Sequence, residues 1–224
     1  MSETKNKIII IAGPTASGKT SLAIRLALGI GAEIVSADSI QIYRYMDIGS
    51  AKPTENEKTL VPHHMIDIRD PDEDYSVGDF VRESRAVIDL LIKKNRIPLV
   101  VGGTGLYIRG LLGGLVDLPA SDKVLRERLL KIAEEGGPDA LHAMLEDVDQ
   151  ASAARIGSQN VSRLARALEV FELTGKRISD LINGHVFSDR PYDSLFICIS
   201  PNREVLYERI DKRVDNMLET GLLD

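Results

Sequence analysis

The 224-residue sequence has one cysteine, no tryptophan and few aromatic residues, which make up 4% of the chain. A single cysteine excludes an intramolecular disulfide and a metal site built from several cysteines. Because Cys198 lies inside an apolar run, we expect its thiol to be buried and unreactive. No apolar stretch approaches the roughly 20 residues of a membrane-spanning helix, and the first residues are polar. The composition therefore predicts a cytoplasmic protein that does not associate with a membrane.

The chain also lacks an excess of positive charge, since its net charge is −6. An acidic balance argues against a protein that coats nucleic acid without specificity, but it leaves room for a local basic surface. With 43% hydrophobic residues, a chain of this length can bury one sizeable core and a smaller appended unit.

The most informative motif is GPTASGKT, which matches G-x-x-x-x-G-K-[ST] at every fixed position. It follows an apolar run and precedes a helical pattern, which is the context that this motif requires. Its glycines let backbone N–H groups point at phosphate oxygens, and the following helix adds the positive end of its dipole. Lys19 would reach the outer phosphate, and the Thr20 hydroxyl would bind Mg²⁺. The residues of this predicted phosphate-binding loop are Gly13, Pro14, Thr15, Ala16, Ser17, Gly18, Lys19 and Thr20.

Short apolar runs alternate with helical patterns outside the middle of the chain, which is typical of a parallel sheet covered by helices. We expect strands at residues 7–12, 33–36, 64–68, 98–102 and 193–200. We expect helices at residues 20–28, 77–94 and from 203 onward. Ser76 and Asp79 resemble a capping box at the start of the second helix. The strand at 98–102 is wholly apolar, which suits the centre of a sheet.

Only helical patterns occur between residues 121 and 184. Ser121 is expected to cap a helix that ends near residue 136, and a second helix follows Pro138. A third should run from Asn160, as its N-cap, to Gly175, as the residue after its C-terminus.

The simplest architecture is an α/β fold, a P-loop NTPase-like parallel sheet core with an all-helical insertion domain. We place the first part of the core at 1–117, the insertion at 118–190 and the rest of the core at 191–224. Residues 222–224 follow the last helical pattern without a closing strand, so we interpret the chain as a truncated fragment.

Two polar segments follow predicted strands, where parallel sheets bind ligands. Asp38, Ser39 and Gln41 form a donor and acceptor set that could contact the edge of a base, and a carboxylate there could accept a proton. Asp38 is equally consistent with a helix cap or an indirect Mg²⁺ ligand. Thr104 lies in the turn GGTG, either as a ligand-binding hydroxyl or as a helix N-cap. This strand ends in glycines rather than the aspartate of nucleotide-hydrolysing P-loop proteins, which weakens an ATPase or GTPase interpretation.

Arginines cluster in two helical segments. Residues 155–177 contain five basic and two acidic residues, and Arg163 and Arg166 share one helix face. This face either contacts a phosphate backbone or is a solvated surface paired with glutamates. Arg209 and Arg213 could stabilise a departing phosphate group together, or pair with acids on their own helix. The adjacent His63 and His64 should point to opposite faces of a strand, so we do not expect them to share a metal ion.

Together these motifs resemble the tRNA dimethylallyltransferase family. The likeness is carried, in order along essentially the whole chain, by GPTASGKT, SADSIQIYRYMDIGSAKP, HHMIDIRDP with YSVGDF, PLVVGGTGLYIRGLL and SRLARALEVFELTGK. It implies transfer of a dimethylallyl group from dimethylallyl diphosphate to the exocyclic amine of the adenosine 3′ of the anticodon. The implied partner is the tRNA anticodon stem-loop, and the implied cofactor is Mg²⁺ near Thr20. We expect a monomer.

The resemblance implies a role for each matching residue. Asp38 would be the general base, Thr104 would contact the nucleotide at the reaction centre, and Arg209 would neutralise the leaving diphosphate. Arg213 would join the phosphate-binding loop in holding the diphosphate. The residues implied to contact tRNA are Asp38, Ser39, Ile40, Gln41, Thr104, Arg126, Ser162, Arg163, Leu164, Ala165 and Arg166. Ser162 stands where the family often has glutamine. Family members continue beyond residue 224, so we expect this fragment to be less than fully active.

Three alternatives remain at this point. A small-molecule P-loop kinase should carry a short lid rather than an insertion of over sixty residues. An adenylate prenyltransferase would make the same bond on a free nucleotide, without an RNA-contacting insertion. A nucleotide-gated binding module, or an inactive RNA-binding remnant, would bind without catalysis.

Overall fold

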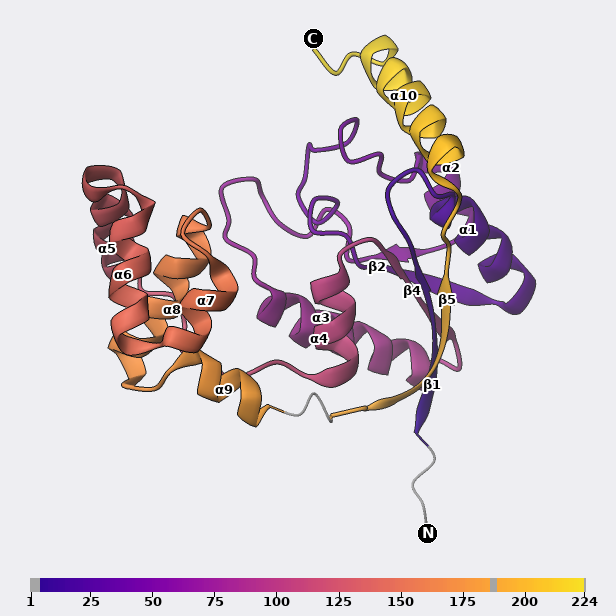
Figure 1. Ribbon diagram of the computed structural model, residues 1–224. Coiled ribbons are helices and arrows are strands. Elements are labelled where there is room, and N and C mark those ends of the chain that lie inside the picture. The colour runs from indigo at the N-terminus through magenta and orange to yellow at the C-terminus, as the bar shows by residue number, and fades with distance from the viewer. Residues whose placement is uncertain (1–4, 186–188, 224) are drawn as a thin grey trace. The chain divides into compact units, whose positions relative to one another are not determined.

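The computed structural model describes residues 5–185 and 189–223, shown in Figure 1. Residues 186–188 of the predicted insertion and the C-terminal Asp224 lie outside the described residues. The chain divides into two compact units, Met1–Gly114 with Asp189–Asp224, and Leu115–Ser188. Among the described residues, no helix is both long enough and apolar enough to cross a membrane.

The first unit contains a five-stranded parallel sheet in the order β3-β2-β4-β1-β5. Its strands are β1 (Asn6–Ala12), β2 (Ala32–Ser36), β3 (His63–His64), β4 (Ile97–Gly102) and β5 (Tyr192–Cys198). The predicted central position of the apolar strand is confirmed, because β4 lies between β2 and β1. Ala12 at the end of β1 lies opposite Gly102 of β4 and Cys198 of β5. The loops that follow these strands therefore leave the sheet at one edge.

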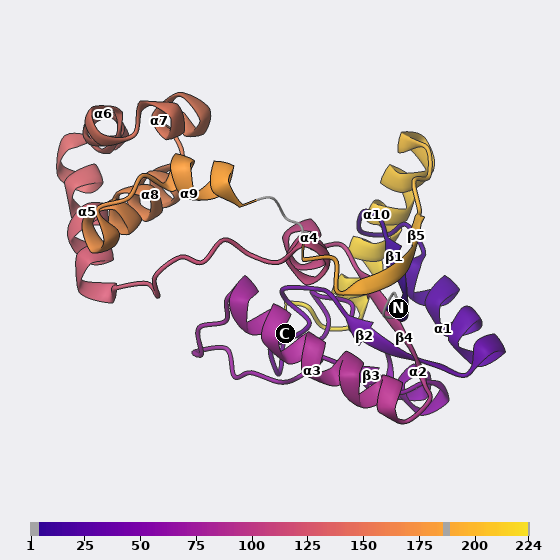
Figure 2. The ribbon, with the colours of Figure 1, turned by 90° about the horizontal axis from the view of Figure 1, so that it is seen from below.

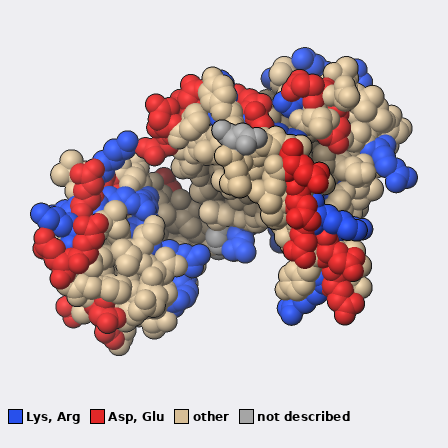
Figure 3. All heavy atoms as spheres, turned by 90° about the horizontal axis from the view of Figure 1, so that it is seen from above, with Lys and Arg blue, Asp and Glu red and all other residues tan. Residues whose placement is uncertain are grey.

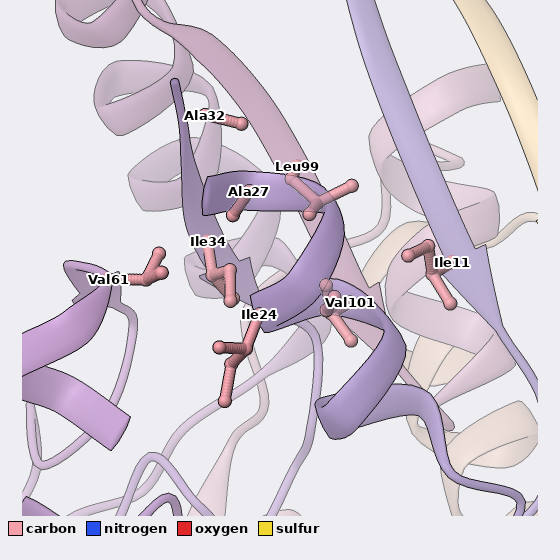
Figure 4. Close-up of a cluster of buried hydrophobic side chains, with 9 residues drawn as sticks. Ile11, Ile24, Ala27, Ala32, Ile34, Val61, Leu99 and Val101 are labelled. Atoms are coloured by element: carbon pink, nitrogen blue, oxygen red, sulfur yellow. The ribbon is translucent and has the colours of Figure 1, made fainter. Parts of the chain in front are cut away.

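Helices cover both faces of this sheet (Figures 1 and 2). They are α1 (Lys19–Ile30), α2 (Glu55–Leu60), α3 (Val77–Lys93) and α4 (Gly105–Gly113), with α10 (Arg203–Glu219) after β5. Side chains alternate between the faces along each strand. Ile11, Ile34 and Leu99 pack with residues of α1, as Figure 4 shows. Ile10 and Val100, on the face covered by α3 and α4, are fully buried. Burial of each such side chain stabilises the fold by about 1.5–3 kcal/mol.

The predicted capping box of α3 is confirmed. The Ser76 hydroxyl accepts a hydrogen bond from the Asp79 backbone N–H at 3.2 Å, and Asp79 Oδ2 accepts one from the Ser76 backbone N–H at 3.0 Å. Two backbone N–H groups that the helix itself cannot satisfy are thereby paired.

We expect Ser76→Ala to lower the free energy of unfolding by about 1 kcal/mol, measured by urea denaturation.

The hydrogen bond from the Ser76 hydroxyl also lowers the pKa of Asp79 from 3.8 to about 2. A carboxylate with a lowered folded-state pKa stabilises the protein fully above about pH 4 and loses this effect as the pH falls toward 2. Asp79→Asn should therefore make the free energy of unfolding depend less on pH between about pH 4 and 2. The same pH dependence in Asp79→Asn and in the unmodified protein would contradict this role of Asp79.

The second unit consists of helices α5 (Lys123–Gly136), α6 (Pro138–Val148), α7 (Gln150–Ile156), α8 (Val161–Thr174) and α9 (Ile178–Gly184). Leu129, Leu141 and Leu145 are fully buried in its core. The predicted caps of α8 are confirmed, because Asn160 accepts a hydrogen bond from the Arg163 N–H and Gly175 adopts a left-handed conformation.

Three expectations about local structure were wrong. Asp122, not Ser121, caps α5, because its carboxylate accepts the Leu125 N–H at 2.9 Å. The third strand is only two residues long, because Met65 turns the chain with a positive φ of 64°. Cys198 is exposed rather than buried, because β5 is an edge strand whose side chains are mostly exposed. The helices α2, α7 and α9 were missed, since six or seven residues are too few for a clear helical period.

Candidate active site

The predicted phosphate-binding loop connects β1 to α1. Gly18 occupies the N-cap position of α1 with a φ of 89°, which favours glycine, and no side chain caps the helix. The first N–H groups of α1 therefore have no side-chain acceptor. Gly13 also requires glycine, because a Cβ atom there would lie 2.6 Å from the Ile199 carbonyl oxygen. The loop has the backbone geometry of an anion-binding helix terminus.

A buried hydroxyl supports the same interpretation. Ser17 is 4% exposed, and its Oγ has no hydrogen-bond partner among the described residues. A buried hydroxyl normally has a partner, because an unpaired one costs about 1–3 kcal/mol. A phosphate oxygen bound in the loop is a suitable acceptor for such a group.

Lys19 lies inside the loop, where its Nζ donates a hydrogen bond to the Pro14 carbonyl oxygen at 2.7 Å. Burial lowers the pKa of Lys19, the nearby Asp38 carboxylate opposes this shift, and the positive charge of Arg213 adds to it. The ammonium group is thus partly desolvated and close enough to Asp38 for the two charges to interact. A bound anion would oppose the lowering of this pKa.

The loop and the predicted base line one open cleft of about 920 Å³. Lining residues come from the loop (Thr15–Thr20), from the segment after β2 (Asp38–Gln41), from the segment after β4 (Gly103 and Thr104) and from α10 (Arg209 and Arg213). All of them belong to the first unit. The structure therefore brings together the three predicted catalytic residues and the phosphate-binding loop.

The Asp38 carboxylate is held by its own loop. Its Oδ1 accepts hydrogen bonds from the backbone N–H groups of Ile40 at 2.9 Å and Gln41 at 3.3 Å. Among the described residues, none donates a hydrogen bond to Oδ2. One carboxylate oxygen therefore fixes the orientation, and the other is available to a ligand in the cleft. This is the arrangement that a general base needs.

Thr104 connects the ends of β2 and β4. Its Oγ1 accepts a hydrogen bond from the Ser39 N–H at 3.1 Å and donates one to Ser39 Oγ at 3.4 Å. Thr104 occupies the N-cap position of α4, but its side chain makes no capping hydrogen bond. The two segments approach so closely that a Cβ at Gly102 would lie 2.0 Å from the Ala37 carbonyl oxygen. Thr104 therefore lies beside the Asp38 loop.

Gln41 differs from the expectation that its amide contacts a base. Its Nε2 donates hydrogen bonds to the carbonyl oxygens of Ser50 and Ala51, at 3.3 Å each, and its Oε1 accepts one from Ser36 Oγ at 3.1 Å. Both N–H groups are thus used inside the protein. The Gln41 side chain holds the segment around residue 50 in place, while the neighbouring Ile40 is 47% exposed at the cleft.

The two arginines of α10 reach the phosphate-binding loop. Arg209 Nη1 lies 3.5 Å from the Ser17 carbonyl oxygen. Arg213 donates to Thr15 Oγ1 at 2.7 Å and to the Gly49 carbonyl oxygen at 3.3 Å. Within the part of the chain that the structure describes, neither arginine forms an ion pair, so the alternative pairing on α10 is wrong. Both guanidinium groups retain N–H donors for an anion.

The donor set of the cleft suits Mg²⁺. This ion prefers oxygen ligands, usually takes only one or two from the protein, and completes its shell with water and substrate phosphates. Thr20 and Asp38 supply oxygen atoms in the cleft. The described residues contain no group of three or more His, Cys, Asp or Glu side chains that could form a metal site by themselves.

In the second unit, a buried carboxylate organises the predicted RNA-binding arginines. Glu169 is 0% exposed and accepts hydrogen bonds from Ser121 Oγ at 2.8 Å, the Asp122 N–H at 2.6 Å and Arg166 Nη1 at 2.6 Å. Burial raises the pKa of Glu169, but the hydrogen bonds from Arg166, Ser121 and Asp122 and the Arg166 charge together outweigh burial, so the pKa is lowered. Arg166 also donates to the Pro119 carbonyl oxygen at 2.6 Å. Its charge is therefore neutralised inside the unit.

The remaining residues of this predicted RNA-binding set have different surroundings. Arg126 donates to Ser162 Oγ at 3.2 Å and lies 3.9 Å from Glu169. Arg163 is exposed, and its side chain has no ion-pair partner among the described residues. Leu164 and Ala165 are fully buried in the core of the unit, which excludes direct contact between their side chains and RNA. Figure 3 shows that basic and acidic side chains both occur on the surface of this unit.

Comparisons with known proteins show which family this chain resembles. The family model described as IPP transferase matches residues 41–224, and the model described as isopentenyl transferase matches residues 6–69. The chain is 48% identical to tRNA dimethylallyltransferase 1 of Syntrophotalea carbinolica, over 96% of this chain and 68% of that protein. It is 47% identical to tRNA dimethylallyltransferase of Geobacter sulfurreducens, over 99% of this chain and 71% of that protein.

Two of the similar solved structures each cover 97% of this chain. One is the full-length tRNA isopentenylpyrophosphate transferase of Bacillus halodurans, with a TM-score of 0.64, 41% identity and 68% of that chain covered. The other is a eukaryotic dimethylallyltransferase acting on tRNA, with a TM-score of 0.83, 34% identity and 54% of that chain covered.

Proposed function

The chain belongs to the IPP transferase family, and we propose that it transfers a dimethylallyl group from dimethylallyl diphosphate to tRNA. The proposed acceptor is the exocyclic amine of the adenosine 3′ of the anticodon. The observation that carries this proposal is the cleft in which the phosphate-binding loop and the Asp38 carboxylate lie together. An electrophile with a diphosphate leaving group and an amine that must lose a proton both fit such a cleft.

The diphosphate would bind to the loop, with Lys19 and the N–H groups at the start of α1 as donors. As the allylic C–O bond breaks, its electron pair moves to the diphosphate oxygen, where negative charge accumulates. Arg209 and Arg213 would stabilise this charge, and their contacts with the loop support this role. Mg²⁺ held by Thr20 would supply further positive charge to the same oxygens.

The amine nitrogen of the adenine would form the new N–C bond and lose one proton. Asp38 Oδ2 is the acceptor that we propose, because Oδ1 is held by two backbone N–H groups. Thr104 would contact the amine from the opposite segment of the cleft floor, since it lies beside Ser39. The base must leave its stack to reach this position, which costs a few kcal/mol. Contacts between the helical unit and the RNA backbone would offset this cost.

Label transfer tests the proposal. Radiolabelled dimethylallyl diphosphate with Mg²⁺ should label an anticodon stem-loop but not AMP, and EDTA should stop the transfer. Labelled AMP would indicate an adenylate prenyltransferase. Tight ATP binding without any response to dimethylallyl diphosphate would indicate a kinase or a nucleotide-gated binding module.

The environments of Arg163 and Arg166 predict different effects on RNA binding. Arg163→Ala should weaken stem-loop binding and reduce the slope of log K against log salt by roughly 0.7–0.9, because one phosphate contact is lost. Arg166→Ala should change this slope by less than half as much, because Glu169 already neutralises Arg166. It should instead destabilise the helical unit by leaving a buried charge unpaired. Equal changes in slope for the two variants would contradict this division.

A further inference from the structure

A second, smaller cavity lies beside the cleft floor, between α1 and the strands β2 and β3. Its volume is about 40 Å³. Ile34 and Val101, visible in Figure 4, lie on its apolar side. Its polar lining includes Thr20 and Asp38, which also line the main cleft, together with His63 of β3.

The hydrogen bonding of His63 determines which of its ring nitrogens carries the proton. Nδ1 lies 2.7 Å from the Val61 carbonyl oxygen, which can only accept. Nδ1 therefore carries the proton, and Nε2 of the neutral ring is an acceptor. Burial lowers the pKa of His63, which keeps the ring neutral near pH 7. Nε2 is buried and has no hydrogen-bond partner among the described residues.

The neighbouring His64 is an internal comparison. Its Nε2 lies 2.8 Å from the Glu33 carboxylate, so this ring is already paired. The two adjacent side chains thus have separate partners, as expected for consecutive strand residues. Of these two histidines, only His63 has a buried ring nitrogen without a hydrogen-bond partner among the described residues.

A buried acceptor without a partner costs about 1–3 kcal/mol. A water molecule needs a cavity of roughly 10–15 Å³ and two to four polar partners. The cavity exceeds this volume, and Lys19, Thr20 and Asp38 supply polar groups in addition to His63. Its size and its mixed donor and acceptor lining fit water better than a larger ligand.

We infer that this cavity is a binding site for an ordered water molecule, which donates a hydrogen bond to His63 Nε2 and bridges it to polar groups of the cleft floor. His63 is then a positioning residue that acts through this water on Thr20 and Asp38. The inferred role in catalysis rests on the proposed function, whereas the water site does not.

A high-resolution crystal structure tests the water site directly. We expect density for water within hydrogen-bond distance of His63 Nε2 in the unmodified protein. The ¹⁵N NMR spectrum of the imidazole should show a protonated Nδ1 and a hydrogen-bonded Nε2. A cavity without density, or a protonated Nε2, would overturn the inference even if the protein transfers dimethylallyl groups normally.

Kinetics test the positioning role. His63→Leu should lower kcat about fivefold to tenfold, as expected for the loss of one hydrogen bond, with the KM for dimethylallyl diphosphate unchanged. His63→Gln, which retains an acceptor, should recover most of kcat. His64→Leu is the matched control and should leave kcat unchanged. Equal losses in His63→Leu and His63→Gln, or a loss confined to KM, would refute the role. Absence of transfer by the unmodified protein would refute the proposed function but not the water site.

Discussion

Asp38→Asn is expected to lower the rate of dimethylallyl transfer by roughly 10²–10⁴-fold, while the affinity for dimethylallyl diphosphate changes less than severalfold. Asparagine retains a carbonyl oxygen that can accept the Ile40 and Gln41 N–H groups, so the loop keeps its shape. It cannot accept a proton from the amine. The variant removes the base and leaves the phosphate-binding loop intact. The transfer rate should therefore fall while the affinity for dimethylallyl diphosphate is retained.

Single-turnover label transfer measures the rate, and titration with the diphosphate and Mg²⁺ measures the affinity. Asp72→Asn changes an exposed carboxylate outside the cleft and serves as the matched control. A parallel loss of donor affinity and rate in Asp38→Asn would show that Asp38 acts on the diphosphate site. Its assignment as the base would then be withdrawn.

Lys19→Ala should have the second largest effect, a loss of about 3–4 kcal/mol of transition-state stabilisation, or 10²–10³-fold in rate. Here donor affinity should fall together with the rate, because the ammonium group contacts the diphosphate before and after the C–O bond breaks. The partly buried position of Lys19 strengthens this interaction, since charges are screened less there than at the surface.

Lys19→Arg should recover little of this loss. The guanidinium is larger and planar, whereas Lys19 fits close to the Pro14 carbonyl oxygen inside the loop. Arg25 lines the same cleft but makes no hydrogen bond to the loop, so Arg25→Ala should reduce the rate less than tenfold. Similar losses in Lys19→Ala and Arg25→Ala would mean that general positive charge matters, rather than a specific contact.

Motifs with local geometry were predictable from the sequence. The loop after β1 depends on glycines at fixed spacing and on the adjoining strand and helix, so its phosphate-binding form is visible in eight residues. The capping box at Ser76 and the caps of α8 are equally local, since each involves residues three or four apart. The central place of β4 followed from its wholly apolar composition.

Features that depend on distant partners were not predictable. Ser121 does not cap α5, because its hydroxyl donates a hydrogen bond to Glu169, 48 positions later in the chain. Asp122 is the N-cap instead. Glu169 also pairs with Arg166, so the charge of Arg166 is not available at the predicted basic surface. The spacing of residues along the helix does not indicate this pairing. The exposure of Cys198 depends on its place in an edge strand, because an apolar run alone does not reveal which strands lack a neighbour.

The sequence by itself determined the phosphate-binding loop, the α/β alternation and the family to which the chain belongs, because each is carried by residues close together along the chain. Only the tertiary structure decided that Asp38, Thr104 and the two arginines of α10 share the cleft with that loop. It also decided that His63, whose buried Nε2 has no hydrogen-bond partner among the described residues, lines a small polar cavity beside them. The physical reason is that a parallel sheet brings the ends of strands β1, β2 and β4 to one edge, although long stretches of chain separate them.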